Sequence, residues 1–140
     1  MEKINQLKKL LNHEGIDGLF IPKNDEFFGE YVENNKDRLK YISNFSGSYG
    51  FALILKKKNY LFVDGRYTLQ AKIQSGSLFE ILNIPKEMPN IVLKDRKFKI
   101  GFNPKLFTSK TLEKLFDKTN CILLPIRYDL IDKIWARKQI

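Results

Sequence analysis

The segment from Asp64 to Tyr67 concentrates side chains that could bind a ligand. It ends a hydrophobic run and comes directly before a helical pattern, in LFVDGRYTLQA at 61–71. Asp64 is placed to cap that helix by accepting hydrogen bonds from its first N–H groups, and Gly65 allows a sharp bend. Arg66 is the unexpected member, because a cation in the first turn faces the positive end of the helix dipole at a cost of about 0.3–1 kcal/mol.

Two interpretations of Arg66 stay open from its chemistry. The guanidinium could form an ion pair with Asp64 or another nearby acid, which requires no ligand. Alternatively, it projects from the sheet edge toward a carboxylate or carbonyl of a substrate or partner, for which its planar set of donors is suited. The residues by themselves weigh these two interpretations evenly.

A second segment, SGSYG at 46–50, invites comparison with a phosphate-binding loop. It lacks the Gly-Lys-Ser/Thr ending on a helix that such a loop requires, and it runs into a strand instead. We therefore expect a tight turn, in which Gly47 and Gly50 adopt backbone angles that other residues rarely take.

The sequence offers few groups for other chemistry. His13 and Cys121 are each the sole residue of their type, so no zinc site of the usual composition can form. The pattern around His13 is that of a surface residue at the polar end of a helix, with no nucleophile beside it. Among the 16 acidic residues no pair stands out in an apolar context. We predict no catalytic residue and no metal ligand in this chain.

Composition limits the class of protein. The 140 residues suit one compact domain, 1–140, and 43% hydrophobic residues suffice for a core. No apolar run approaches the roughly 20 residues that cross a bilayer, so no membrane partner is expected. The lone cysteine and the absence of a signal-peptide pattern favour a cytoplasmic location. The net charge of +9 admits nucleic-acid binding, but the lysines are scattered apart from short groups such as Lys56–Lys58, so we do not expect it.

Strands alternate with helices along most of the chain. Apolar periodicity predicts helices at 2–14, 38–43, 65–74, 90–95, 108–118 and 129–136, and strands at 18–22, 49–55, 59–63, 78–84, 97–102 and 121–125. The second and third strands should form a β-hairpin, whereas crossovers through helices give parallel neighbours. The prediction is an α/β fold with a three-layer architecture, a mixed β-sheet flanked by helices. Residues 23–37 are expected to form a surface loop.

The order of these motifs resembles the N-terminal domain of Xaa-Pro aminopeptidases, in the creatinase/prolidase family. The resemblance is carried by ISNFSGSYG at 42–50, the hairpin, and VDGRYTLQA at 63–71. It is supported by IGFNPKLFTS at 100–109 and RYDLIDKIWARK at 127–138. The resemblance implies a ribonuclease-H-like topology, in agreement with the alternation of strands and helices.

Members of this family remove an N-terminal residue that precedes proline. They use two divalent ions, commonly manganese, held by Asp, Asp, His, Glu and Glu in a C-terminal pita-bread domain, which this chain lacks. The resemblance thus implies a non-catalytic domain that lines the substrate cleft and aids subunit contacts, inactive by itself. Its partners would be a peptide with proline in second position, the remaining domains and a second copy in a homodimer. A standalone peptide- or protein-binding module is the alternative.

Carried over residue by residue, the resemblance assigns substrate binding to Arg66. Asp64 and Tyr67 would support it, by capping the helix and packing the corner. Ser46 and Gly47 would belong to a neighbouring loop that lines the same cleft. No metal ligand carries over, because the matching positions do not exist in this chain.

Overall fold

The computed structural model describes residues 2–23, 37–47, 50–84, 86–94, 96–106, 109–117, 119–126 and 129–135. The elements in chain order are α1 (Glu2–Glu14), β1 (Gly18–Pro22), α2 (Arg38–Ser43), β2 (Gly50–Leu55), β3 (Asn59–Asp64), η2 (Gly65–Tyr67), α3 (Thr68–Ser75), β4 (Glu80–Ile84), α4 (Pro89–Val92), β5 (Lys99–Phe102), α5 (Ser109–Leu115), β6 (Ile122–Pro125) and α6 (Leu130–Ile134). The expected loop at 23–37 lies outside the described residues except for its two ends.

The strands form a mixed sheet in the order β4-β3-β2-β1-β5-β6. The predicted hairpin is confirmed, because β2 and β3 pair antiparallel with Leu53 opposite Tyr60. The β3–β4, β1–β5 and β5–β6 pairs are parallel, as crossovers through helices predict. The β1–β2 pair differs from that rule, because it is antiparallel although α2 lies between the two strands. The connecting segment therefore leaves and re-enters the sheet at the same end.

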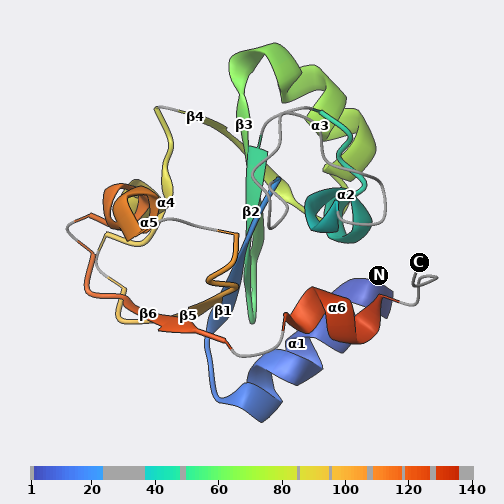
Figure 1. Ribbon diagram of the computed structural model, residues 1–140. Helices are drawn as coiled ribbons and strands as arrows, with labels where there is room; N and C mark the ends of the chain where they lie inside the picture. Colours follow the sequence, from blue (N-terminus) through green and yellow to red (C-terminus); the bar gives the residue numbers. More distant parts are fainter. Residues whose placement is uncertain are drawn as a thin grey trace.

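Helices cover both faces of the sheet, which confirms the predicted three layers (Figure 1). On one face, α1, α2, α3 and α6 bury their apolar sides against alternate residues of β1, β2 and β3. On the other face, α4 and α5 cover the remaining residues of the same strands. Because β1 and β2 are buried on both faces, their sequences read as continuous apolar runs.

Aromatic side chains pack between the central strands and α5. Phe20 of β1 and Phe62 of β3 each lie with their ring centroids 5.1 Å from that of Phe51, on the strand between them. Phe116, just after α5, meets Phe20 edge to face at 5.2 Å. These rings bury large areas at defined distances and so hold α5 in register with the central strands.

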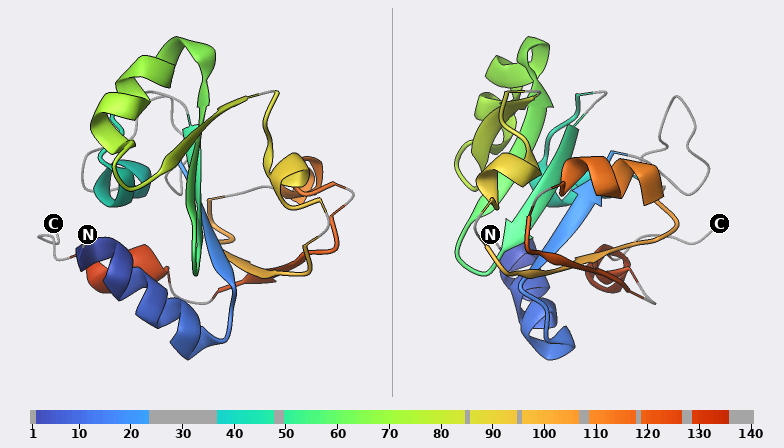
Figure 2. Two further views of the ribbon diagram at one scale, coloured as in Figure 1. Left: turned by 180° about the vertical axis from the view of Figure 1, so that it is seen from behind. Right: turned by 90° about the vertical axis from the view of Figure 1, so that its left-hand side faces the viewer.

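Ion pairs of the buried Arg38 join α6, the last described helix, to α2. Arg38, whose side chain is 4% exposed, lies 3.2 Å from Asp129 Oδ2 through its Nε. The same guanidinium donates to both carboxylate oxygens of Asp132 at 3.0 Å. Burial raises the pKa of Asp129, although Asn103 donates a hydrogen bond to it and Arg38 lies beside it. Both views of Figure 2 place α6 beside α1, which closes this end of the helical layer.

The first helix ends where the sequence predicts, whereas α5 and α6 end at Leu115 and Ile134, before the predicted ends at 118 and 136. Gly15, directly after α1, has a φ of 70°, a left-handed conformation that glycine adopts without a Cβ penalty. Asp129 caps α6 by accepting hydrogen bonds from Ile131 and Asp132. No helix within the described ranges is long and apolar enough to cross a membrane.

Candidate functional site

The corner at the end of β3 contains the residues that the sequence singled out. A helix was expected from 65 to 74, but the chain first forms one 3-10 turn, η2, and only then the α-helix α3. Asp64 caps this turn, since its Oδ1 accepts a hydrogen bond from Arg66 N at 2.9 Å. The pKa of Asp64 is lowered, first by this backbone hydrogen bond and then by the one from the Arg66 side chain.

Arg66 points away from the core. Its side chain is 77% exposed, and its Nε lies 3.2 Å from Asp64 Oδ1. Its guanidinium carbon lies 5.5 Å from the centre of the Tyr67 ring. The ion pair of the first interpretation is therefore present, and the exposure that the second interpretation requires is present as well.

Tyr67 connects the corner to the Ser46 loop, the described residues 44–47 between α2 and β2. Its half-buried ring meets Phe45 edge to face, with centroids 6.0 Å apart and planes at 80°. Phe45 is fully buried in the core on this side of the sheet. The base of the corner is therefore rigid, while the arginine beside it is exposed.

The Ser46 loop is bound to α3 through side chains that the sequence reasoning missed. Ser46 Oγ accepts hydrogen bonds from Gln70 Nε2 at 3.0 Å and from Gln74 Nε2 at 2.8 Å. Ser46 N donates to Gln74 Oε1 at 3.0 Å. Two glutamines four residues apart on a helix face the same direction. The spacing of Gln70 and Gln74 in the sequence indicates a shared helix face, but the neighbouring residues do not indicate that Ser46 is their partner.

The predicted unusual backbone angles of Gly47 and Gly50 are wrong. Neither Gly47 nor Gly50 has a positive φ, and the left-handed residue is Asn44, with a φ of 66°, at the end of α2. The glycines are required for space instead. A Cβ on Gly47 would lie 2.2 Å from the Phe45 ring, and one on Gly50 would lie 3.0 Å from the carbonyl oxygen of Phe62.

Gly65 also differs from expectation. Its φ is not positive, and a Cβ built on it would meet no atom within 4 Å. The corner therefore bends through ordinary 3-10 backbone, and neither conformation nor space within the described chain requires glycine there. The surface beside Arg66 is accordingly open at this position.

The outer face of α3 continues from Arg66 as an apolar surface. Leu69 is 73% exposed and Ile73 is 76% exposed. Leu69 and Ile73 follow the spacing i and i+4, which places them on one side of α3, and Arg66 lies in η2, the turn directly before that helix. We call these three residues the α3 outer face. The opposite side of α3 is packed, since Ala71 and Ser75 are buried.

The described part of the chain does not fit a metal centre. No three His, Cys, Asp or Glu side chains among these residues come close enough to hold an ion. His13 is exposed near the end of α1. The two-ion centre that the family resemblance implies therefore has no counterpart in the described residues.

Known proteins match this chain along most of its length. A family model described as Creatinase/Prolidase N-terminal domain matches residues 3–133. A probable Xaa-Pro aminopeptidase P of Coprinopsis cinerea is 29% identical over 149 residues, which cover 99% of this chain and 24% of that protein. The structure of X-prolyl aminopeptidase from Caenorhabditis elegans, described as a cytosolic enzyme with a di-nuclear active site, has a TM-score of 0.82 and 25% identity.

The extent of these matches differs between full-length proteins and isolated domains. The match to the Caenorhabditis elegans enzyme covers 96% of this chain and 25% of that one. The N-terminal domain of the cytoplasmic peptidase PepQ from Mycobacterium tuberculosis is 21% identical with a TM-score of 0.69, and the match covers 94% of this chain and 97% of that one. The chain thus spans about a quarter of the length of the aminopeptidases that it matches.

Proposed function

The chain belongs to the creatinase/prolidase N-terminal domain family, and on that premise we propose that it is the non-catalytic N-terminal domain of a metal-dependent Xaa-Pro aminopeptidase. In this proposal the remaining domains release the N-terminal residue that precedes proline. This domain lines the cleft in which the peptide lies and contributes to subunit contacts. The 140 residues have no hydrolytic activity by themselves. The names of the relatives and the quarter of their length that the chain spans support this division.

The observation that carries the proposal is the α3 outer face. Exposing two large aliphatic side chains side by side is unfavourable, since burying each is worth about 1.5–3 kcal/mol. Leu69 and Ile73 are nevertheless more than 70% exposed, directly beside an exposed arginine. An apolar surface with a cation at its edge is typical of a surface that another protein body covers. We assign that role to the remaining domains, with Arg66 at the border of the cleft.

Arg66 is suited to hold a peptide in that position. Asp64 accepts a hydrogen bond from its Nε at the corner. Within the described chain, its two terminal nitrogens form no ion pair, so they are available for a carboxylate or carbonyl of the peptide. The rigid base formed by Tyr67, Phe45 and the Ser46 loop would keep the arginine in one place as the peptide binds.

Three finer features belong to the proposal. The metal is a pair of divalent ions, manganese by family resemblance, held outside this chain. The location is cytoplasmic, which the cytosolic description of the Caenorhabditis elegans enzyme supports. The enzyme is a homodimer, an expectation that comes from the family alone.

The test substitutes Arg66→Ala in the full-length aminopeptidase that carries this domain. A charge-assisted hydrogen bond to the peptide is worth about 1.5–3 kcal/mol, so kcat/KM for Xaa-Pro peptides should fall about 10- to 100-fold. Metal content and melting temperature should stay unchanged, because the side chain is exposed. Lys72→Ala is the matched control, since it removes an exposed cation from α3, the helix directly after the turn that carries Arg66. Normal turnover by the Arg66→Ala enzyme would show that Arg66 does not bind the peptide and only forms its ion pair with Asp64.

The alternative of a standalone binding module is favoured by the same exposed face, which any protein partner could cover. The size of the native gene product decides between the two. An immunoblot band several times larger than 16.5 kDa supports the aminopeptidase. A band at the chain's own size supports the standalone module and directs attention to proteins that bind the α3 outer face.

A further inference from the structure

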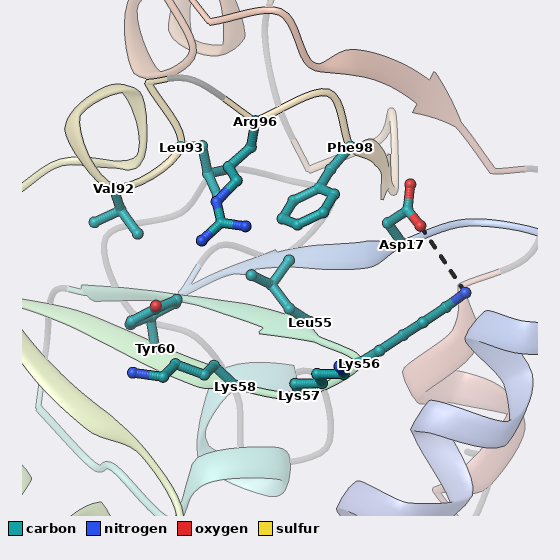
Figure 3. A pocket seen from close by; sticks show the side chains of 10 residues that line it. All are labelled: Asp17, Leu55, Lys56, Lys57, Lys58, Tyr60, Val92, Leu93, Arg96 and Phe98. Atoms are coloured by element: carbon teal, nitrogen blue, oxygen red, sulfur yellow. Dashed lines mark ion pairs between the residues drawn. The ribbon is translucent and has the colours of Figure 1, made fainter.

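A pocket of about 510 Å³ lies at the hairpin end of the sheet (Figure 3). We call it the basic pocket. Its lining residues are Asp17, Leu55, Lys56, Lys57, Lys58, Tyr60, Val92, Leu93, Arg96 and Phe98. It is separate from the Arg66 corner, because Tyr60 and Asp64 lie four residues apart along β3, roughly 13 Å in an extended strand.

The pocket forms where the segment after α4 passes over the end of the β2–β3 hairpin. Figure 3 shows the Arg96 guanidinium extending into the space beside Phe98, with Leu55 of β2 and Tyr60 of β3 facing it from the sheet. The lysines of the hairpin turn form the opposite rim. Arg96 and these lysines are about forty positions apart in the sequence, so only the fold brings them together.

The pocket carries an excess of positive charge. Four of its lining side chains are cationic and one is a carboxylate, which gives a formal charge of +3. Asp17 is 3.9 Å from Lys56, and Lys58 is 3.8 Å from Glu80, which lies outside the lining. Across the described ranges, Lys57 and Arg96 form no ion pair. A bound anion would therefore meet two cations that have no carboxylate partner among the described residues.

The other side of the pocket is apolar. Phe98 lies against Arg96, with the guanidinium carbon 5.8 Å from the ring centre. Leu93 is buried next to Arg96, and the half-buried Tyr60 faces them from the sheet. A concave site of a few hundred cubic ångströms with apolar walls and a few converging polar groups is the usual form of a small-molecule site.

We propose that the basic pocket binds a small organic phosphate, in which a phosphate group is attached to a planar apolar body. Lys57 and Arg96, the two lining cations without an ion pair across the described ranges, match a dianion better than a single carboxylate. The aromatic wall gives the body a surface on which to stack. A nucleic-acid backbone would instead require an extended basic track. The cationic residues here line one pocket of limited volume. This site requires no peptide and is independent of the proposed aminopeptidase role.

The experiment titrates the 140-residue protein with phenyl phosphate, inorganic phosphate and phenol, and follows amide signals by two-dimensional NMR. Phenyl phosphate should shift signals of residues 55–60 and 92–98 and bind several-fold more tightly than either of the other two probes. Lys57→Gln and Arg96→Gln should each weaken phenyl phosphate about 10-fold, the loss expected for one charge-assisted hydrogen bond. Lys114→Gln, which removes an exposed cation from α5, should leave the affinity unchanged.

Three results would overturn the proposal. Equal affinity for inorganic and phenyl phosphate would show that the apolar wall plays no part. Equal weakening by Lys114→Gln would show a response to net charge alone. Tight binding of a short single-stranded oligonucleotide with a steep salt dependence, but none of phenyl phosphate, would assign the lysines to a nucleic-acid surface. Because all three substituted side chains are exposed, the variants should fold, and their amide spectra establish this directly.

Discussion

Replacing Arg38 by methionine should destabilise the protein strongly at neutral pH. The substitution keeps most of the apolar stem of the side chain but removes the cation that pairs with Asp129, whose side chain is 8% exposed. Removing one partner of a buried ion pair costs about 3–5 kcal/mol. Asp132 is 37% exposed, so its share is small and the lower end of that range applies. At roughly 3–5 °C per kcal/mol for a chain of this size, the melting temperature should fall by about 9–15 °C.

The loss of stability caused by Arg38→Met should be larger at neutral pH than at acidic pH. Burial already raises the pKa of Asp129 above its ordinary value of 3.8, and the charge of Arg38 opposes that rise. Without Arg38 the folded-state pKa rises further. A carboxyl with a raised folded-state pKa contributes stability that is present below pH 3.8 and is lost as pH rises through the folded-state value. The difference between the wild-type protein and Arg38→Met should therefore shrink as pH falls toward 3.8.

Urea denaturation followed by circular dichroism measures this effect as a double-mutant cycle. Asp129→Asn keeps an N-cap for α6 and removes the charge, so in the Arg38→Met background it should recover stability at pH 7. Asp132→Asn in the same background is the matched control and should recover little, because water already solvates that carboxylate. Equal destabilisation by Arg38→Met at every pH, or equal recovery by the two asparagine substitutions, would contradict an uncompensated buried charge on Asp129.

Alanine substitutions at Gly47 and Gly65 test whether each glycine is required, the first because a Cβ would clash and the second because neither space nor backbone conformation demands glycine. Gly47→Ala should destabilise the protein by about 1–3 kcal/mol in urea denaturation, because its Cβ would lie 2.2 Å from the Phe45 ring; an unchanged midpoint would mean that the ring can move aside. Gly65→Ala should be neutral or stabilising by about 0.4–1 kcal/mol in the same assay, since it meets no atom and restricts the unfolded chain. In the full-length aminopeptidase, Gly65→Ala should lower kcat/KM if the corner faces the peptide, and unchanged kinetics would argue against that position.

Local patterns in the sequence were sufficient for the elements themselves. The helix 2–14 and its end at Gly15 follow from apolar spacing and a glycine that can take a positive φ. The hairpin follows from two apolar runs around a polar turn. The Asp64 cap requires only a carboxylate two residues before the N–H group from which it accepts a hydrogen bond. In each case the interacting groups lie within a few residues, so the sequence records their separation directly.

Pairs that are distant in sequence were not predictable in this way. The antiparallel pairing of β1 with β2 depends on where a long connection re-enters the sheet. The hydrogen bonds of Ser46 to α3 join residues 24 and 28 positions apart, and those of Arg38 to Asp132 of α6 join residues 94 positions apart. A single sequence holds no signal for such separations, because any of many polar side chains could serve as the partner.

For the two candidate sites, sequence and tertiary structure contributed different parts. The sequence identified Arg66 as out of place at a helix start and, through its resemblance to a family, attached a role to it. Only the fold shows that Leu69 and Ile73, close to Arg66 in sequence, are exposed to solvent. Likewise, only the fold shows that Lys57 and Arg96 line one pocket. The physical reason is that helix and strand periodicity fixes which side of an element a residue occupies. What faces that side depends on how the layers pack.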